Sequence, residues 1–213
     1  MTSLQEYSFS CQELVIAAKM GNLDMLREAH NNDCQWNSDI CDVAAENGHL
    51  EILIYAHEHD CPLDSLITAY AARGGHINIL DWLMEHGYSC NKLTFAWAAI
   101  GGNLDILIKL REISCPWNEW VCHNAASNGH LRVLKWAREN GCSWNHVTCY
   151  SAASEGHLEI LQWALENGCK WDGYIHPSSK RPEILKWMRI NKFILNENIP
   201  RYNYSEVIRF RIF

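Results

Sequence analysis

Ten cysteines and eleven histidines give this chain of 213 residues its main supply of metal-ligating and nucleophilic side chains. Three cysteine pairs lie seven residues apart, and His123 adjoins one of them: Cys34 and Cys41, Cys115 and Cys122, Cys142 and Cys149. Thiolates and imidazoles at a recurring spacing are ligands that zinc prefers. No C-x-x-C pair is present, however, and a structural zinc ion needs four converging ligands. We therefore predict no metal site and no cofactor.

The cysteines can also be interpreted as small apolar side chains. One position of a repeating pattern holds cysteine in three copies and other residues in three more: Cys41, Cys122 and Cys149 against Leu14, Thr68 and Phe95. Cysteine that interchanges with core residues behaves as a small buried hydrophobe. The chain starts MTSLQEYSFS, without the basic and apolar regions of a secretion signal. We therefore expect a reducing, intracellular location.

The histidines follow the same pattern. Four of them come directly after a repeated glycine, where the other copies have asparagine: His49, His76, His130 and His157, with Asn22 and Asn103. This position predicts the start of a helix and not a ligand. His59 and His86 are equivalent residues of adjacent copies. We expect these two histidines and His57 at exposed helix ends. Equivalent positions lie about one helix-packing distance of roughly 8–10 Å apart, so His59 and His86 are too far from each other for direct pairing.

Motifs for catalysis are missing from the sequence. It has no glycine-rich phosphate loop after a strand, no nucleophile elbow and no H-E-x-x-H pair. It also lacks a run of the roughly 18 apolar residues that a bilayer-spanning helix requires. We therefore predict that the protein is not an enzyme, takes no small-molecule substrate and does not bind a membrane.

The cysteines and histidines are positioned by a unit of 27 residues. A glycine recurs at this interval, and each one follows an Ala-Ala pair: Gly21, Gly48, Gly75, Gly102, Gly129 and Gly156. Apolar residues two, four, five and eight positions after each glycine form one stripe of a helix. The segment before the glycine predicts a shorter helix, whose small alanines allow a close approach at the turn. Each unit is therefore a helix, a tight turn and a second helix.

A four-residue joint ends each unit, as in CPWN and CSWN, and its last member is always Asn or Asp: Asn37, Asp64, Asn91, Asn118, Asn145 and Asp172. This residue predicts an N-cap for the next helix. One unit cannot bury its own apolar faces, so copies must stack into an all-α solenoid. We expect an N-terminal cap at 1–10, six repeats at 11–172, and a partial seventh repeat with a basic C-terminal cap or tail at 173–213.

The run A-A-x-x-G-H-L-E-I-L, with Gly-Cys and then Asn or Asp at fixed distances, resembles the second half of the ankyrin repeat. The resemblance covers about residues 11–172 and recurs in six copies. These units are six residues shorter than the family's usual 33, and the missing stretch corresponds to its β-hairpin finger. Short repeats rich in cysteine and tryptophan are similar to those of giant DNA viruses of amoebae. The resemblance implies an ankyrin-like solenoid without the fingers.

In the ankyrin family the inner helices and their turns usually bind a protein partner. This resemblance places a partner site at two positions that vary between copies while their neighbours do not: Tyr70, Arg73, Trp97, Ile100, Asn124 and Ser127. Aromatic and arginine side chains are enriched at interface hot spots. Tyr70 and Trp97 have a second interpretation, in which they pack between the first helices.

Charge divides the chain into two parts. Residues 1–179 carry 10 basic against 22 acidic side chains, a balance of −12, and residues 180–213 carry 8 against 3, a balance of +5. The repeat body should therefore repel nucleic acid. We expect a protein partner, with a host factor as one possibility. Two alternatives stay open: a structural component of a virion, and a nucleic-acid binder that acts through the basic tail.

Overall fold

The computed structural model describes residues 9–171, 173–175 and 181–193, and this part of the chain contains helices and no strands. The helices are α1 (Cys11–Lys19), α2 (Leu23–Asn31), α3 (Ser38–Asn47), α4 (Leu50–Glu58), α5 (Ile67–Gly74), α6 (Ile77–Glu85), α7 (Lys92–Gly101), α8 (Leu104–Glu112), α9 (Trp120–Ser127), α10 (Leu131–Glu139), α11 (His146–Glu155), α12 (Leu158–Glu166) and α13 (Pro182–Ile190). The predicted all-α solenoid of helix pairs is confirmed. The predicted domain limits stay a prediction, because most of the proposed N-terminal cap and tail lie outside the described residues.

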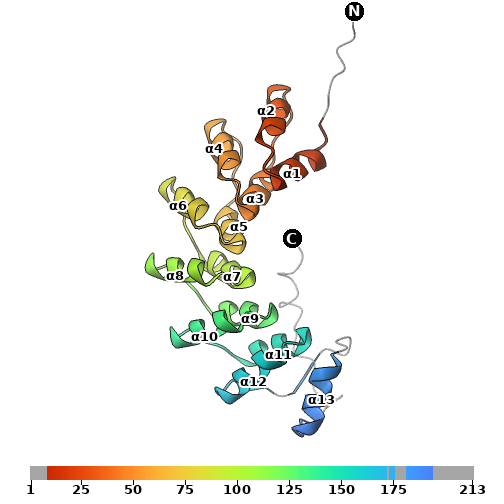
Figure 1. Cartoon of the computed structure of the whole chain (residues 1–213). Helices are drawn as coiled ribbons and strands as arrows, with labels where there is room; N and C mark the ends of the chain where they lie inside the picture. The colour runs from red at the N-terminus through yellow and green to blue at the C-terminus, as the bar shows by residue number, and fades with distance from the viewer. Residues whose placement is uncertain (1–8, 172, 176–180, 194–213) are drawn as a thin grey trace, which may run out of the picture.

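The helices form two rows (Figure 1). The odd-numbered helices α1 to α11 line the inner row, and the even-numbered helices α2 to α12 form the outer row. Successive inner helices pack closely against one another, whereas the outer helices are more widely spaced. The stack therefore curves, and the inner row lines its concave side. α13 follows as one further helix of the outer type, at the shortened spacing that the sequence indicates.

The turn inside each repeat combines small side chains with a left-handed backbone. In the fourth repeat Ala98 and Ala99 are fully buried, and Gly102 ends α7 with a φ of 73°. A Cβ atom at Gly102 would lie 2.5 Å from the His130 ring of the next repeat. Glycine is thus required here both by its φ and by the close approach of the neighbouring repeat.

The histidines that follow the repeated glycines stand at the starts of the outer helices, as predicted, but their rings do not cap those helices. Each Nε2 instead makes a hydrogen bond to a carbonyl oxygen near the end of the inner helix of the preceding repeat: His49 to Lys19 at 3.0 Å, His76 to Glu46 at 3.0 Å, His130 to Ile100 at 2.8 Å, and His157 to Ser127 at 3.1 Å. In the C-terminal segment Arg181 takes this role, and its Nε donates to the Ser154 carbonyl. These side chains therefore join successive repeats.

Two joint residues cap the following inner helix, as predicted: Asn91 is the N-cap of α7 and Asn145 that of α11, and each accepts a backbone N–H of its helix through its side-chain oxygen. Asp64 and Asn118 accept the backbone N–H of Leu66 and of Trp120, but the N-cap residues of α5 and α9 are Leu66 and Glu119, which make no side-chain capping bond. Asn37 is the N-cap residue of α3 and makes no capping bond, and its Nδ2 contacts Asp39 Oδ2 at 2.9 Å. Asp172 lies outside the described residues.

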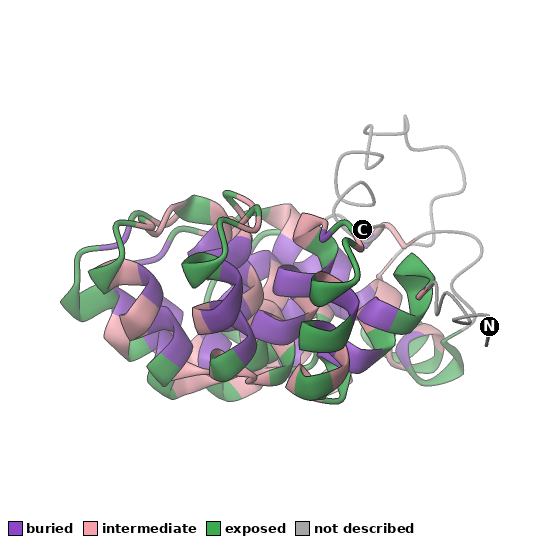
Figure 2. Cartoon of the chain, turned by 90° about the horizontal axis from the view of Figure 1, so that it is seen from above, coloured by how far each residue is buried: buried purple, intermediate pink, exposed green. Residues whose placement is uncertain are grey.

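The core lies between the two rows, where Figure 2 shows the buried residues gathered along the stack. It consists of two main clusters of buried side chains. One extends from Leu14 to Leu83, and the other from Ala72 to Met188. The two clusters meet at α5 and α6, so the apolar core is not continuous along the molecule.

Candidate protein-binding face

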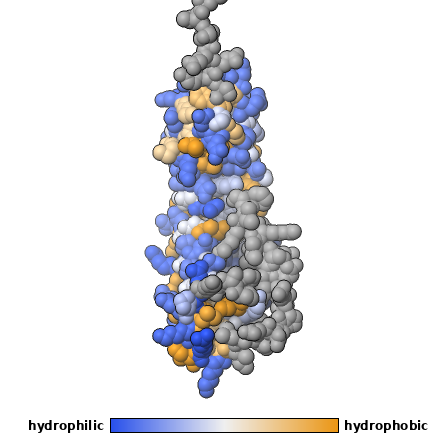
Figure 3. Space-filling model, turned by 90° about the vertical axis from the view of Figure 1, so that its right-hand side faces the viewer, coloured by the Kyte–Doolittle hydropathy of each residue, from blue (hydrophilic) through white to orange (hydrophobic). Residues whose placement is uncertain are grey.

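The six residues predicted to bind a partner lie on three successive inner helices. Tyr70 and Arg73 are on α5, Trp97 and Ile100 on α7, and Asn124 and Ser127 on α9. Figure 3 views this side of the molecule, and hydrophobic residues form separate patches there among hydrophilic ones. The inner row thus brings the six residues onto one side, over the middle of the curve.

Trp97 is a packed residue. Only 8% of it is exposed, and it clusters with Ala69 and Ala96. Its ring meets the Tyr70 ring edge to face, with 4.9 Å between the centroids and an interplanar angle of 89°. Of the two interpretations, packing between first helices therefore holds for Trp97. Tyr70 is half-buried, so part of its surface still faces solvent.

Arg73 connects the aromatic pair to the preceding repeat. Its Nε lies 3.3 Å from Glu46 Oε1 on α3. Its guanidinium carbon lies 6.0 Å from the centroid of the Trp97 ring, within the range of a cation–π contact. Arg73 is therefore oriented by α3 and α7 together.

Asn124 and Ser127 also contribute to the stack. Asn124 Nδ2 donates a hydrogen bond of 2.9 Å to the Ala96 carbonyl on α7. The Ser127 carbonyl lies 3.1 Å from His157 Nε2. These contacts hold α9 against its neighbours, and the first of them fixes the position of the Asn124 side chain at the concave face.

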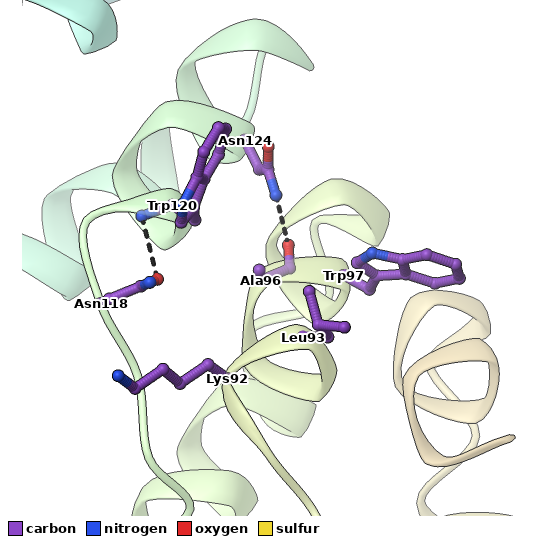
Figure 4. Close-up of a pocket in the computed structure, with 7 residues that line it drawn as sticks. All are labelled: Lys92, Leu93, Ala96, Trp97, Asn118, Trp120 and Asn124. Atoms are coloured by element: carbon purple, nitrogen blue, oxygen red, sulfur yellow. Dashed lines mark hydrogen bonds between the residues drawn. The ribbon is translucent and has the colours of Figure 1, made fainter. Parts of the chain in front are cut away.

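A pocket opens between α7 and α9 next to these residues (Figure 4). Its volume is about 210 Å³, and its walls come from Lys92, Leu93, Ala96, Trp97, Asn118, Trp120 and Asn124. The Asn124–Ala96 hydrogen bond crosses one side of it, and the Asn118 side chain accepts the Trp120 backbone N–H on another. The pocket is mostly apolar with an ammonium group at its edge, so it can accept an apolar side chain.

Five of the pocket residues were missed by the sequence reasoning: Lys92, Leu93, Ala96, Asn118 and Trp120. Trp120 carried a usable signal, because its position in the repeat holds Leu66, Leu93 and Val147 in other copies. A bulky residue at a variable position beside a joint indicates an irregular local surface. The pocket itself depends on the difference in size between Trp120 and Ala96, which belong to different repeats.

An acidic group lies on the same side, at α3 and α5. Asp42 is 6% exposed, and its Oδ1 has no hydrogen-bond partner among the described residues. Burial, followed by the charges of Asp64 and Asp39, raises the pKa of Asp42 to about 7. Burial and then Asp42 also raise the pKa of the Tyr70 phenol.

The cysteines form different pairs from those in the sequence pattern. The Cys149 thiol donates to the Cys169 carbonyl oxygen at 4.0 Å, and the neighbouring Cys142, together with burial, raises the pKa of Cys122. The seven-residue pairs are not the ones that meet. Burial raises the pKa of Cys41 to about 12, so this thiol stays protonated at neutral pH. In the described ranges all cysteines are free, and no three His, Cys, Asp or Glu side chains are placed to hold a metal ion.

Comparisons with known proteins agree with this geometry. Residues 122–165 match the family model for ankyrin repeats (many copies). The crystal structure of the human ASB11 ankyrin repeat domain superposes with a TM-score of 0.56 at 15% sequence identity, and the match covers 82% of this chain and 96% of that one. The fold is an ankyrin-repeat solenoid. A search of curated proteins gave no match. Within the described residues of this solenoid, no helix has the length and apolar character to cross a membrane.

Proposed function

We propose that this ankyrin-repeat solenoid is a non-enzymatic adaptor that binds a protein partner on its concave face, at α5, α7 and α9. Ankyrin repeats generally mediate protein–protein interactions. The observation that carries the proposal is the open pocket between α7 and α9, which has two tryptophan walls. Apolar pockets with aromatic walls are where anchoring residues of a partner contribute most of the binding energy.

The roles of the predicted site residues follow from their contacts. Trp97 and Asn124 form the wall of the pocket, and they are held by Tyr70 and Ala96 respectively. Arg73, Ile100 and Ser127 lie at the C-terminal ends of their helices on the same side. In this proposal they contact the partner around the pocket, where polar groups add specificity.

The finer parts of the proposal rest on the resemblance to giant-virus repeats and on charge. They are an intracellular host protein as the partner, or else a structural role in a virion. A nucleic-acid role for the basic tail, 180–213, falls mainly outside the described residues. The acidic repeat body supports a protein partner over nucleic acid.

A test is the selection of short peptides from a random display library on the full chain. Their affinities are then compared between the wild type and a Lys92→Glu/Leu93→Ser variant. Both residues open α7, where a negative charge suits the helix dipole, so the fold should be retained. We expect at least about tenfold weaker binding, because the pocket loses an apolar wall and its rim changes sign.

Arg132→Glu provides the matched control. Arg132 is exposed in the first turn of the outer helix α10, so the change reverses a charge at a similar helical position away from the concave face. Binding should change less than about twofold. Peptides that bind the pocket variant as tightly as the wild type would place the site elsewhere and contradict the proposal.

A further inference from the structure

Equivalent positions of the second and fifth repeats carry different chemistry. In the fifth repeat His123 Nε2 lies 3.1 Å from Asn145 Oδ1, which joins α9 to the start of α11. The same two positions, 81 residues earlier, hold Asp42 on α3 and Asp64 before α5. Two ionised carboxylates cannot form the hydrogen bond that histidine and asparagine form. Two acidic side chains therefore occupy the positions at which the fifth repeat forms a hydrogen bond between histidine and asparagine.

The burial of Asp42 makes this substitution costly. The residue is 94% buried, and among the described residues nothing bonds to its Oδ1. Buried carboxylates are normally paired with a cation or are well hydrogen-bonded, because leaving water costs a charged group several kcal/mol. The buried Oδ1 of Asp42 therefore lacks, among the described residues, the partner that such an oxygen normally has.

The surroundings of Asp42 add negative charge. Asp64 and Asp39 are the charged groups that act on it, and both disfavour its ionised form. On α5, the cation Arg73 is already paired with Glu46. The half-buried Tyr70 ring is close enough for its phenol to respond to Asp42, Asp64 and Asp39. Carboxylates beside a half-buried aromatic ring make an environment that suits a guanidinium or ammonium group.

We propose that Asp42, together with Asp39 and Asp64, binds a basic side chain, arginine or lysine, of the protein partner. This inference rests on the proposed function and names the chemistry of the partner at α3 and α5, one repeat away from the pocket. A partner segment that crosses the concave face would place a basic residue at α3 and α5 and an apolar residue between α7 and α9. Binding would convert Asp42 to its ionised form and release its proton.

The test uses the peptides selected on the full chain, each synthesised with its basic residue replaced by neutral citrulline or norleucine. On the wild type we expect the replacement to weaken binding at least about tenfold. On Asp42→Asn the same replacement should change affinity less than about twofold, because the carboxylate that it paired with is gone. Asn is isosteric with Asp and removes a buried charge, so this variant should fold.

Proton release gives a second readout that a structural role would not change. Titration calorimetry near pH 7 in buffers of different ionisation enthalpy should show release of about half a proton per peptide from the wild type, because Asp42 titrates near this pH. Asp42→Asn should release none. Asp105→Asn removes the same charge from an exposed site on the outer helix α8, and it should leave both affinity and proton release unchanged.

The outcomes separate this inference from the proposed function. The inference is overturned, and the binding face kept, if the selected peptides need Lys92 and Leu93 for binding but share no basic residue. The same holds if Asp42→Asn leaves their affinity unchanged. If no concave-face variant changes the affinity of the peptides, the proposed function is overturned. A full-length variant with Arg201, Arg209 and Arg211 changed to Gln tests the chain's own basic tail. If that variant binds the peptides more tightly than the wild type, the tail itself occupies the acidic site. This result would contradict the binding of a partner's side chain there.

Discussion

Neighbouring repeats are joined by different contacts towards the ends of the solenoid and at its centre. At three joints a tryptophan packs against an aromatic ring of the next outer helix: Trp36 with Tyr55 at 5.6 Å, Trp117 with Trp136 at 6.0 Å, and Trp144 with Trp163 at 5.7 Å between ring centroids. The two central joints hold Leu63 and Cys90 at the corresponding position. The joint tryptophan contact is therefore found towards both ends and not at the two central joints, where the His57 ring on α4 instead meets the Trp82 ring on α6 with 5.6 Å between centroids.

The centre has closer contacts on its inner side instead. The Thr68 and Thr94 hydroxyls form a buried hydrogen bond of 2.9 Å between α5 and α7. A Cβ atom on Gly101 would lie 2.0 Å from the Arg73 carbonyl oxygen, so the backbones of these two helices nearly touch. The apolar core divides at the same place. The inner helices beneath the proposed binding face are thus closely joined at α5 and α7.

Removal of a large buried side chain beside the boundary between the two core clusters should have the largest effect on the free energy of unfolding. Phe95 is fully buried and its ring lies 5.0 Å from Trp117. We expect Phe95→Ala to lower the free energy of unfolding by about 3–5 kcal/mol, because it leaves a cavity in the C-terminal cluster. Hydrogen exchange should show the loss of protection mainly in α7 to α13, since stability in a solenoid is a sum of local terms. Equal loss in α1 to α4 would mean that the two clusters unfold as one.

The close approach at the centre can be tested with a single methyl group. Alanine normally stabilises a helix relative to glycine by about 1 kcal/mol. We expect Gly101→Ala to destabilise the protein by about 1–3 kcal/mol in urea unfolding, because its Cβ would collide with the Arg73 carbonyl. Asn128 is the equivalent residue in the next repeat and already has a Cβ atom, so Asn128→Ala should be nearly neutral. A stabilised Gly101→Ala variant would contradict the close packing of α5 and α7.

The acidic side chains at α3 and α5 predict that the stability of the fold depends on pH. Folding raises the pKa of Asp42 from its ordinary 3.8 to about 7, so the native state favours the protonated form. Its destabilising effect is absent at low pH and grows as the pH rises between these two values. Asp42→Asn should therefore be more stable than the wild type, by a margin about 2 kcal/mol larger at about pH 8.5 than at about pH 5.5.

Urea unfolding at the two pH values measures this margin. Asp39 on α3 and Asp64 before α5 are the charged groups that act on Asp42, and both remain in the variant. On the other side, α1 carries Glu13 in its first turn and Lys19 in its last. Asp105→Asn, an exposed change of the same charge, should show no such dependence. A margin that is constant with pH would mean that Asp42 is ionised throughout this range.

The repeat frame could be predicted from the sequence, whereas most of the candidate site could not. Evenly spaced glycines, alanine pairs and joint residues report contacts inside one repeat, so the helices and turns followed from them. The burial of Trp97, the bonding of His130 to Ile100 and the pocket beside Trp120 depend on contacts between repeats. Their distances are set by the stacking, and no spacing along the chain encodes those distances. Asp42 shows a related limit, since its neighbour Asp64 lies 22 residues away along the chain, in the joint that precedes α5.

The smallest expected effect comes from supplying the missing aromatic contact. At three other joints the tryptophan meets an aromatic residue 19 positions later, and Trp82 stands 19 positions after Leu63. We expect Leu63→Trp to raise the free energy of unfolding by about 0.5–1.5 kcal/mol, the value of a well-oriented aromatic pair. Exchange protection of α4 and α6 should also approach that of α10 and α12. Leu63→Ala is the control and should lower stability, because it only removes apolar contact. If Leu63→Trp were destabilising, the central joints would be too tight for an indole, and their lack of tryptophan would follow from the close packing of the inner helices.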